Sequence, residues 1–321
     1  MPESADRDAP RLDTAGALLT MAGLTTLVFS IIEAPEAGWG SARTLGGVGG
    51  GLVILAAFAG WEHRAAHPML DVRHFRSRRL SAGSLSIFIQ FFAFFGFTFV
   101  CLQYLQGVRG DSPLRAALSV LPLAATMMPT ARITPRLAAR FGARAVCVTG
   151  LVLAAAGLAV ISRVGVTSPY WLLVAGLIPL GVGMGAAMTP ATAAITEGLP
   201  AAQQGVGSAL NDLSREVGGA LGIAVIGSIV TAVYRSNLDL TGVPAALADQ
   251  ARGSFALAIH AGGPVKATAS TAFADGIHSG LLYAAAAALI AAITVTALLP
   301  GDLRARRDAR RGQPDLSPAT R

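Results

Sequence analysis

Long apolar runs alternate with short polar segments along almost the whole chain. Eight of these runs carry few charges and reach about 20 residues, the length that an α-helix needs to cross roughly 30 Å of hydrocarbon. They lie near residues 14–34, 43–61, 81–105, 113–133, 144–164, 170–193, 212–233 and 274–299. The pattern predicts an all-α integral membrane protein with eight transmembrane helices.

The composition supports the same class of protein. Hydrophobic residues make up 53% of the chain and charged residues 13%, with a mean hydropathy of +0.58, which excludes an ordinary soluble globular domain. The segment before Ala15 is acidic, whereas a secretory signal peptide begins with basic residues. We therefore expect no cleaved signal peptide.

The basic residues predict the orientation, because Lys and Arg in short loops stay on the cytoplasmic side. One set of alternate loops holds eighteen of the 25 basic residues: Arg7, Arg11, Arg64, Arg73, Arg76, Arg78, Arg79, Arg132, Arg136, Arg140, Arg144, Arg215, Arg304, Arg306, Arg307, Arg310, Arg311 and Arg321. The other set holds Arg43, Arg109, Arg115, Arg163, Arg235, Arg252 and Lys266. We expect a multi-pass protein of the cell (plasma or inner) membrane with both termini in the cytoplasm.

The net charge of +7 follows from this asymmetry and from the anionic lipid that the basic loops face. A nucleic-acid-binding protein would gather its basic residues on one soluble face beside stacking aromatic side chains, and this chain does not. Cys101 and Cys147 both fall inside predicted spans, so they predict no disulfide framework.

Two motifs suggest binding sites that we reject. The glycines of "GLIPLGVGMG" (residues 176–185) resemble a dinucleotide loop, but that loop needs a preceding strand and a helix that opens in water. Within a membrane, small residues let helix backbones approach closely. The pairs Gly47/Gly51 and Gly218/Gly222 have the four-residue spacing that suits the same close packing. Packing is therefore the favoured interpretation.

The second motif is the loop "WEHRAAHPMLDVRHF", in which His63, His67, Asp71 and His74 recur at near-helical intervals. On one helix face these side chains would suit a metal ion. Pro68 interrupts that helical register, so a solvated loop explains the residues equally. We expect no metal ion and no cofactor.

The stretch "PRLAARFGAR" resembles the cytoplasmic-loop signature of major facilitator transporters. Leu137, Ala138, Arg140, Gly142 and Arg144 match that signature. Pro135 replaces its leading glycine and Ala139 its acid, so the charge relay that the family attributes to the acid is in doubt here. Independently of the resemblance, a basic tight turn at this place caps carbonyls and joins two helix ends, and general positive-inside charge is the alternative explanation.

Three longer stretches resemble the fourteen-helix drug:proton antiporters of the major facilitator superfamily. They are "RLDTAGALLTMAGLTTLVFSIIEAPEAGWGS", "WEHRAAHPMLDVRHFRSRRLSAG" and "GVGMGAAMTPATAAITEGLPAAQQGVGSALNDLSREVGGALGIAVIGSIV". They correspond, in order, to the seventh helix, the loop before the ninth and the twelfth-to-thirteenth region of that family. The resemblance implies that the eight spans are helices seven to fourteen.

The resemblance also implies a partial major-facilitator fold with two linker helices and a C-terminal six-helix bundle. The expected divisions are a cytoplasmic N-terminal segment (1–12), a linker hairpin (13–62), a basic cytoplasmic loop (63–80), the bundle (81–299) with an extracytoplasmic loop at 234–273, and a disordered basic tail (300–321). Within that loop, residues 244–262 are compatible with a short amphipathic helix.

The function that the resemblance implies is proton-coupled multidrug efflux by alternating access, not enzymatic catalysis. The expected partners are the lipid bilayer, small lipophilic or cationic substrates, protons, and an N-terminal six-helix half if that half is encoded separately. A truncated remnant that does not transport, or an assembly or regulatory partner of a complete exporter, remains the alternative.

Candidate site residues are polar or aromatic groups in apolar spans. Gln90, Gln103 and Phe94 are candidates for a transport pathway, because aromatic rings suit flat lipophilic cations, although lipid-facing phenylalanine is the alternative. The centres of the predicted spans contain no Asp or Glu. The coupling acids are therefore expected in the missing half, with Asp212 the local candidate.

The charges before the seventh span predict a helix mouth that acts as a gate. Asn211, or Ser214, is a candidate N-cap, and acids near a helix start favour its dipole. Arg215 is free to pair with Glu216 or with an acid of another bundle, while Asp212 and Glu216 supply the negative charge. A capped helix start with no gating role is the alternative.

Overall fold

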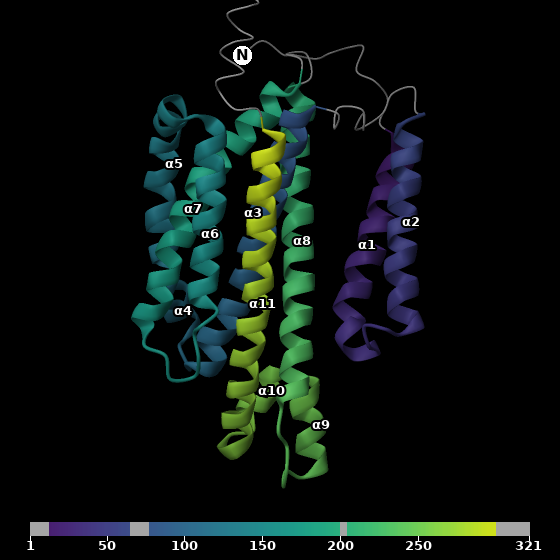
Figure 1. The fold of residues 1–321 in the computed structure, drawn as a ribbon. Coiled ribbons are helices and arrows are strands. Elements are labelled where there is room, and N and C mark those ends of the chain that lie inside the picture. Colours follow the sequence, from purple (N-terminus) through teal and green to yellow (C-terminus); the bar gives the residue numbers. More distant parts are fainter. Residues whose placement is uncertain (1–12, 65–76, 200–203, 300–321) are drawn as a thin grey trace, which may run out of the picture. The chain divides into compact units, whose positions relative to one another are not determined.

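The computed structural model describes residues 13–64, 77–199 and 204–299, and every regular element within them is a helix (Figure 1). Eight of the helical segments in this part of the chain are long and apolar enough to cross a membrane. This confirms the predicted all-helical membrane fold with eight spans. The chain divides into two compact units, residues 1–76 and 77–321, which are described separately.

Unit 1 is an antiparallel hairpin of α1 (Thr14–Ala37) and α2 (Ala42–Glu62). The Asp13 carboxylate caps α1 by accepting from Gly16 N at 2.9 Å, and it also accepts from Trp61 Nε1 at 3.0 Å. At the other end of the hairpin, Arg43 and Glu33 form an ion pair of 2.8 Å. The two helices are thus joined at both ends by polar contacts.

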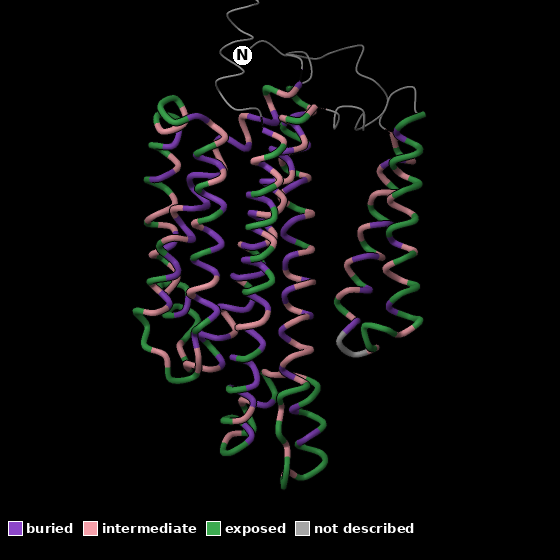
Figure 2. Tube along the Cα trace, in the orientation of Figure 1, coloured by how far each residue is buried: buried purple, intermediate pink, exposed green. Residues whose placement is uncertain are grey.

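Unit 2 contains the remaining helices. They are α3 (Arg78–Gln103), which continues as a π-helical turn (Tyr104–Val108), α4 (Pro113–Ser119), α5 (Leu121–Phe141), α6 (Ala143–Ile161), α7 (Tyr170–Glu197), α8 (Gln204–Asn237), α9 (Ala245–Gly253), α10 (Phe255–His260) and α11 (Gly263–Leu298). The buried core lies among α3, α6, α7, α8 and α11 (Figure 2).

Glycines bring α6 and α7 into backbone contact. A Cβ atom added to Gly150 would lie 2.7 Å from Gly183 O, and one added to Gly157 would lie 2.6 Å from Gly176 O. No side chain larger than hydrogen fits at such a distance, so the backbones meet directly. The same holds for Gly218 on α8, which lies against Phe88 O of α3.

The remaining glycines of the predicted packing motifs also lie at helix contacts. Gly185 of α7 lies against the backbone of α5, Gly222 of α8 against Phe92 O of α3, and Gly51 of α2 against Leu27 of α1. The packing interpretation of these glycines is confirmed.

Several helices are longer than the sequence pattern predicts. Helix α8 begins at Gln204 and not near residue 212, α11 begins at Gly263 and not near 274, and α5 continues to Phe141 through Pro135. Polarity marks where a helix leaves the hydrocarbon, but a helix continues beyond that point as long as its backbone hydrogen bonds are satisfied.

The predicted loop at 234–273 is consequently largely helical. It contains the end of α8, the short helices α9 and α10, and the start of α11. We call α9 and α10 (residues 245–253 and 255–260) the cap. Between α8 and the cap, Asp239 accepts from the Thr241 hydroxyl and N–H, and these hydrogen bonds hold the pKa of the Asp239 carboxyl below its usual value.

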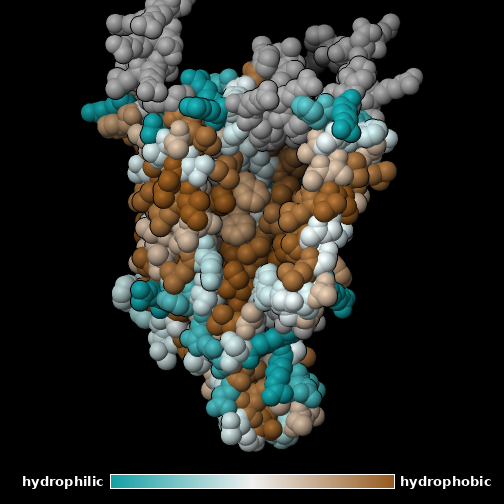
Figure 3. Space-filling model, turned by 45° about the vertical axis from the view of Figure 1, so that its right-hand side comes forward, coloured by the Kyte–Doolittle hydropathy of each residue, from teal (hydrophilic) through white to brown (hydrophobic). Residues whose placement is uncertain are grey.

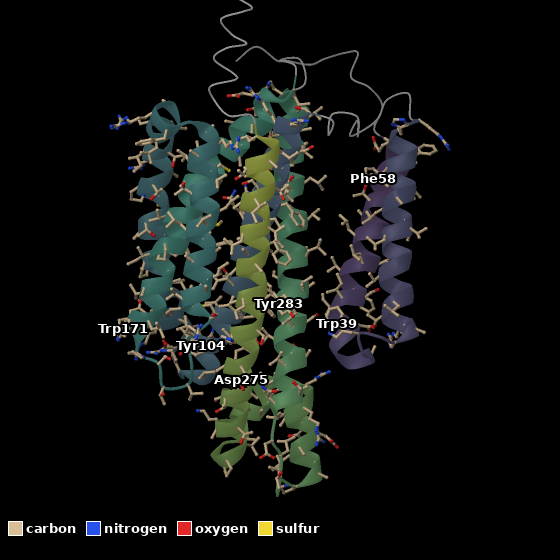
Figure 4. The ribbon with its side chains drawn as sticks, viewed as in Figure 1. Trp39, Phe58, Tyr104, Trp171, Asp275 and Tyr283 are labelled. Atoms are coloured by element: carbon tan, nitrogen blue, oxygen red, sulfur yellow. The ribbon has the colours of Figure 1, made fainter. Side chains whose placement is uncertain are left out.

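The two ends of unit 2 differ. The cap projects from one end, the cap end, and the turn between α5 and α6 lies at the opposite, basic end (Figure 1). Apolar residues cover the middle of the helices on the face drawn in Figure 3, while hydrophilic ones gather toward both ends. Tyr104, Trp171 and Asp275 lie toward the cap end (Figure 4).

The α6–α7 contact gives a test of the packing. We expect Gly183→Ala to destabilise the chain by about 1–3 kcal/mol, because the added methyl meets the α6 backbone, which overpacks the interface. The matched control is Gly205→Ala on α8, where nothing lies within 4 Å of the added atom. It should be neutral or stabilising by roughly 0.5–1 kcal/mol.

The measurement is the temperature of half-aggregation of the purified chain in detergent. Equal midpoints for the two variants would contradict the direct α6–α7 contact.

Candidate functional site

Four phenylalanines form a continuous stripe along α3. Phe88, Phe92, Phe95 and Phe99 follow helical spacing, and we call them the aromatic face. The half of this stripe toward the cap end is open, since Phe95 is 39% and Phe99 42% exposed. Phe88 and Phe92 stack with ring centroids 6.3 Å apart.

Glycines of α8 make room for this face. A Cβ atom on Gly219 would lie 2.9 Å from the Phe95 ring, and one on Gly227 would lie 3.1 Å from the Phe99 ring. The rings therefore lie across α8 instead of pointing away from it. Phe94, a predicted pathway residue, is partly buried against the core and meets the Phe95 ring edge-on, with centroids 5.4 Å apart.

The structure corrects the predicted helix mouth at Asn211–Glu216. Because α8 begins at Gln204, these residues lie inside the helix and none of them is an N-cap. Ser214 Oγ donates to Leu210 O, and Asn211 Oδ1 accepts from Thr192 Oγ1 of α7 at 3.3 Å. Asn211 thus joins α8 to α7.

Arg215 pairs with Asp212 and not with Glu216. Its Nη1 atom lies 3.7 Å from Asp212 Oδ1, one helical turn earlier, whereas neighbours in sequence point to different sides of a helix. The guanidinium carbon also lies 4.7 Å from the centroid of the Phe91 ring, a cation–π contact. Phe91 in turn contacts Phe95, with centroids 6.0 Å apart, so the Arg215 charge adjoins the aromatic face.

The register of α3 and α8 gives the depth of this charge. Gly218 of α8 meets Phe88 of α3, and the next glycine contact lies four residues further along both helices, so the two helices run parallel. Arg215 is therefore level with Leu85 of α3. Leu85 lies about two helical turns after Arg78, where α3 starts, which is roughly 10 Å along the bundle. The charged residues of this α8 segment thus lie about two helical turns in from the start of α3, beside Phe91.

Glu216 is exposed on the outer side of α8. Among the residues that the structure describes, no hydrogen bond or ion pair reaches its carboxylate. It shares that side with Ala220, which is also exposed. A carboxylate so placed is available to a proton, a cationic ligand or another protein surface.

The two predicted pathway glutamines lie in different surroundings. Gln90 is only 2% exposed and faces the inside of the bundle, where its Nε2 donates to Ser86 O at 3.1 Å and to Ser86 Oγ at 3.0 Å. Ser86 Oγ lies 3.4 Å from Cys147 Sγ of α6. Gln103 is half-buried at the cap end and adjoins Phe99 in the wall of two hollows.

The predicted cytoplasmic-loop residues surround a one-residue turn. Gly142 ends α5 and starts α6 with φ 95°, a conformation that favours glycine, and its N–H donates to Ala138 O at 2.8 Å. Arg140 lies over the Phe141 ring at 5.2 Å. Leu137 and Arg144 are half-buried beside the turn. No acidic partner contacts either arginine in the described residues.

Sequence reasoning missed two polar clusters. Glu62, at the end of α2, is 1% exposed and lies with Asp13 around Gly16. At the cap end, the Asp111 carboxylate lies 3.5 Å from Arg109 Nε and 3.1 Å from Arg115 Nε. The π-helical turn before Asp111 had no signal in the hydrophobic pattern. Of the four candidate metal ligands in the histidine loop, His63 is described, and His67, Asp71 and His74 lie outside the described residues.

The fold and the site define a multi-pass, all-helical membrane protein with a charged group beside an exposed aromatic helix face. Residues 14–223 match the family model of the Major Facilitator Superfamily. The chain belongs to this superfamily.

Individual relatives are drug resistance and efflux proteins. The chain is 34% identical to the tetracenomycin C resistance and export protein of Streptomyces glaucescens over 70% of its own length and 42% of the relative. It is 32% identical to the multidrug efflux pump LfrA of Mycolicibacterium smegmatis over 93% of its length and 58% of the relative, and 32% identical to the multidrug resistance protein Stp of Mycobacterium tuberculosis over 74% and 44%. It spans about half the length of these relatives.

The contact between Arg215 and Phe91 is testable with a double-mutant cycle. We expect Phe91→Leu and Arg215→Met to show a coupling energy of about 0.5–1 kcal/mol, because each variant alone removes the cation–π contact. The measurement is unfolding of the purified chain by sodium dodecyl sulfate.

The control cycle combines Phe91→Leu with Arg79→Met, since Arg79 pairs with Glu197 and not with an aromatic ring. This pair should be additive. Additive effects in the first cycle as well would contradict the contact between Arg215 and the Phe91 ring.

Proposed function

We propose that this chain is the C-terminal part of a proton-coupled multidrug efflux antiporter. In this proposal α1 and α2 are the linker hairpin, and unit 2 is the C-terminal six-span bundle. The bundle works by alternating access against an N-terminal six-helix half, either in the same polypeptide or in a separate one. The names of the relatives support drug export as the activity.

One observation carries the proposal. Helices α3 and α8 expose an aromatic face next to three charged residues, Asp212, Arg215 and Glu216. Exposed rings beside charged groups suit a surface that faces a substrate path and a second bundle better than one that faces lipid.

Further parts of the proposal concern topology and site residues. The basic end of unit 2, with Arg140 and Arg144, faces the cytoplasm, as do both termini, and the membrane is the cell membrane. Gln103 and the aromatic face contact the substrate, which is a small lipophilic or cationic compound. Gln90, being buried, supports the bundle interior instead.

Drug efflux from cells is the direct test. Cells that express the chain alone should not export ethidium, because one bundle cannot enclose a site. Cells that also express the first six spans of a full-length relative such as LfrA should export ethidium and survive higher concentrations of it. Membrane abundance of the chain, measured by immunoblot, is the control.

The alternative is a remnant or a regulatory partner without transport activity. It predicts that co-expression leaves ethidium efflux at the level of the empty vector, while a complete exporter in the same cells changes in activity when the chain is present. That pair of results would replace the transporter proposal.

The charged segment of α8 suggests a gate. In this proposal Arg215 stays paired with Asp212 in one state and moves to an acid of the opposite bundle in the other, which closes the path on the cytoplasmic side. The 3.7 Å separation from Asp212 and the 40% exposure of the Arg215 side chain support this, because the pair is neither short nor buried.

In the active assembly we expect Arg215→Ala to reduce ethidium efflux about tenfold or more, since a lost charge-assisted contact is worth roughly 1.5–3 kcal/mol. Arg215→Lys should retain part of the activity. Labelling of a cysteine at Ala220, one turn after Glu216 on the exposed side of α8, should change in Arg215→Ala. Unchanged efflux together with unchanged labelling would end the gating proposal.

A further inference from the structure

An open hollow of about 570 Å³ lies at the cap end, between the last turns of α3 and helix α10. One wall includes Phe99, Gln103, Gln106 and Asp111, and the other includes Ile259 and His260. A smaller hollow of about 200 Å³ adjoins it and shares Phe99 and Gln103. The larger volume falls within the roughly 300–1,000 Å³ range of pockets for drug-sized ligands.

The π-helical turn shapes the first wall. Its wider winding brings Gln103, Gln106 and Gly107 to the hollow together with Phe99 of the preceding turn, and such turns occur often at functional sites. Gly107 is the point of closest approach, because a Cβ atom there would lie 2.5 Å from Phe255 Cε1. Only glycine allows α10 to sit this close.

Aromatic stacking fixes the second wall. The Phe255 ring lies flat on the Phe273 ring, with centroids 4.0 Å apart and an interplanar angle of 5°, and it meets Tyr234 edge-on at 5.9 Å. The Tyr234 hydroxyl donates to Ala251 O at 2.7 Å and so ties α8 to the cap. The hollow is therefore formed before any ligand arrives, which lowers the entropic cost of binding.

The charges around the hollow disfavour a cation. Asp111 is its only carboxylate among the described lining residues, and two guanidinium groups already pair with it, those of Arg109 and Arg115. Arg252 lines the adjoining hollow and pairs with Asp249 at 3.3 Å. Three guanidinium groups against two carboxylates leave one net positive charge here, which disfavours a cationic ligand.

The remaining polar groups are suited to hydrogen bonding. Gln103 Nε2 donates to Phe99 O over a long 3.4 Å, which leaves its other N–H and its amide oxygen for a further partner. Gln106 is exposed, and no hydrogen bond joins its amide to the described residues. His260, which lines the hollow, has its Nδ1 atom 2.6 Å from Ala256 O, which leaves Nε2 for another partner.

We infer that this hollow is a binding site for an uncharged, planar aromatic compound that carries carbonyl or hydroxyl groups. Phe99 and Phe255 contact the ring system, and Gln103 and Gln106 bond its oxygens. Export of such a compound rests on the proposed function, whereas its binding to this chain is independent of that proposal.

Direct binding tests the inference without a second bundle. The probe is 1,8-dihydroxyanthraquinone, and the full 321-residue chain is held in phospholipid nanodiscs, with empty nanodiscs to subtract partition into lipid. We expect saturable binding at one site. Ethidium, a planar cation of similar size, should bind at least about tenfold more weakly.

Two tryptophan variants on α10 locate the site. Ile259→Trp fills the hollow and should weaken probe binding about tenfold, a loss of roughly 1.4 kcal/mol. Leu257→Trp is the matched control, since Leu257 is 54% exposed on the same helix and does not line the hollow. It should bind the probe within about twofold of the unmodified chain.

A third variant covers the case in which Ile259→Trp fails to fold. Gln103→Leu keeps the side-chain volume, removes the amide and should weaken binding about fivefold, the value of one hydrogen bond. The inference is overturned by an absence of saturable binding, by equal loss in both tryptophan variants, or by unchanged binding in Gln103→Leu. Equal affinity for ethidium would contradict the inference that the site prefers an uncharged ligand. Failed efflux with intact probe binding would instead count against the proposed function alone.

Discussion

The direct contact of helix backbones at glycine is the constraint on which unit 2 depends. In lipid there is no hydrophobic force between helices, so association relies on close packing. Gly150 and Gly183 join α6 to α7, and Gly218 and Gly222 join α8 to α3. Weak Cα–H···O contacts between such backbones add to the packing. These contacts set the register of each pair and leave little freedom for sliding.

That register determines what the outer side of α3 and α8 presents. Because α8 meets α3 through glycine, the bulky rings of α3 lie across α8, and Arg215 lies beside Phe91. The cation–π contact with Phe91 contributes roughly 0.5–2 kcal/mol, and the ion pair of 3.7 Å with Asp212 contributes less than a short one. The Arg215 side chain is 40% exposed, so water or another protein surface has access to it.

The sequence was sufficient for the eight spans, because apolar length is a local property that each segment displays by itself. It was also sufficient for the packing glycines. Residues 244–262, expected to form one short amphipathic helix, are helical but divide into α9 and α10. The sequence was not sufficient for the start of α8 at Gln204. Nor did it separate Gln90 from Gln103, since tertiary packing alone decides that one bonds Ser86 inside the bundle and the other lines a hollow.

The two candidate sites of unit 2 share one side chain. Phe99 is the last ring of the aromatic face and at the same time part of the wall of both hollows at the cap end. Charged groups adjoin this face near Arg215, whereas amides adjoin it near Gln103. In the proposed transport path, a compound that moves along the rings would keep its apolar contacts and exchange only its polar partners.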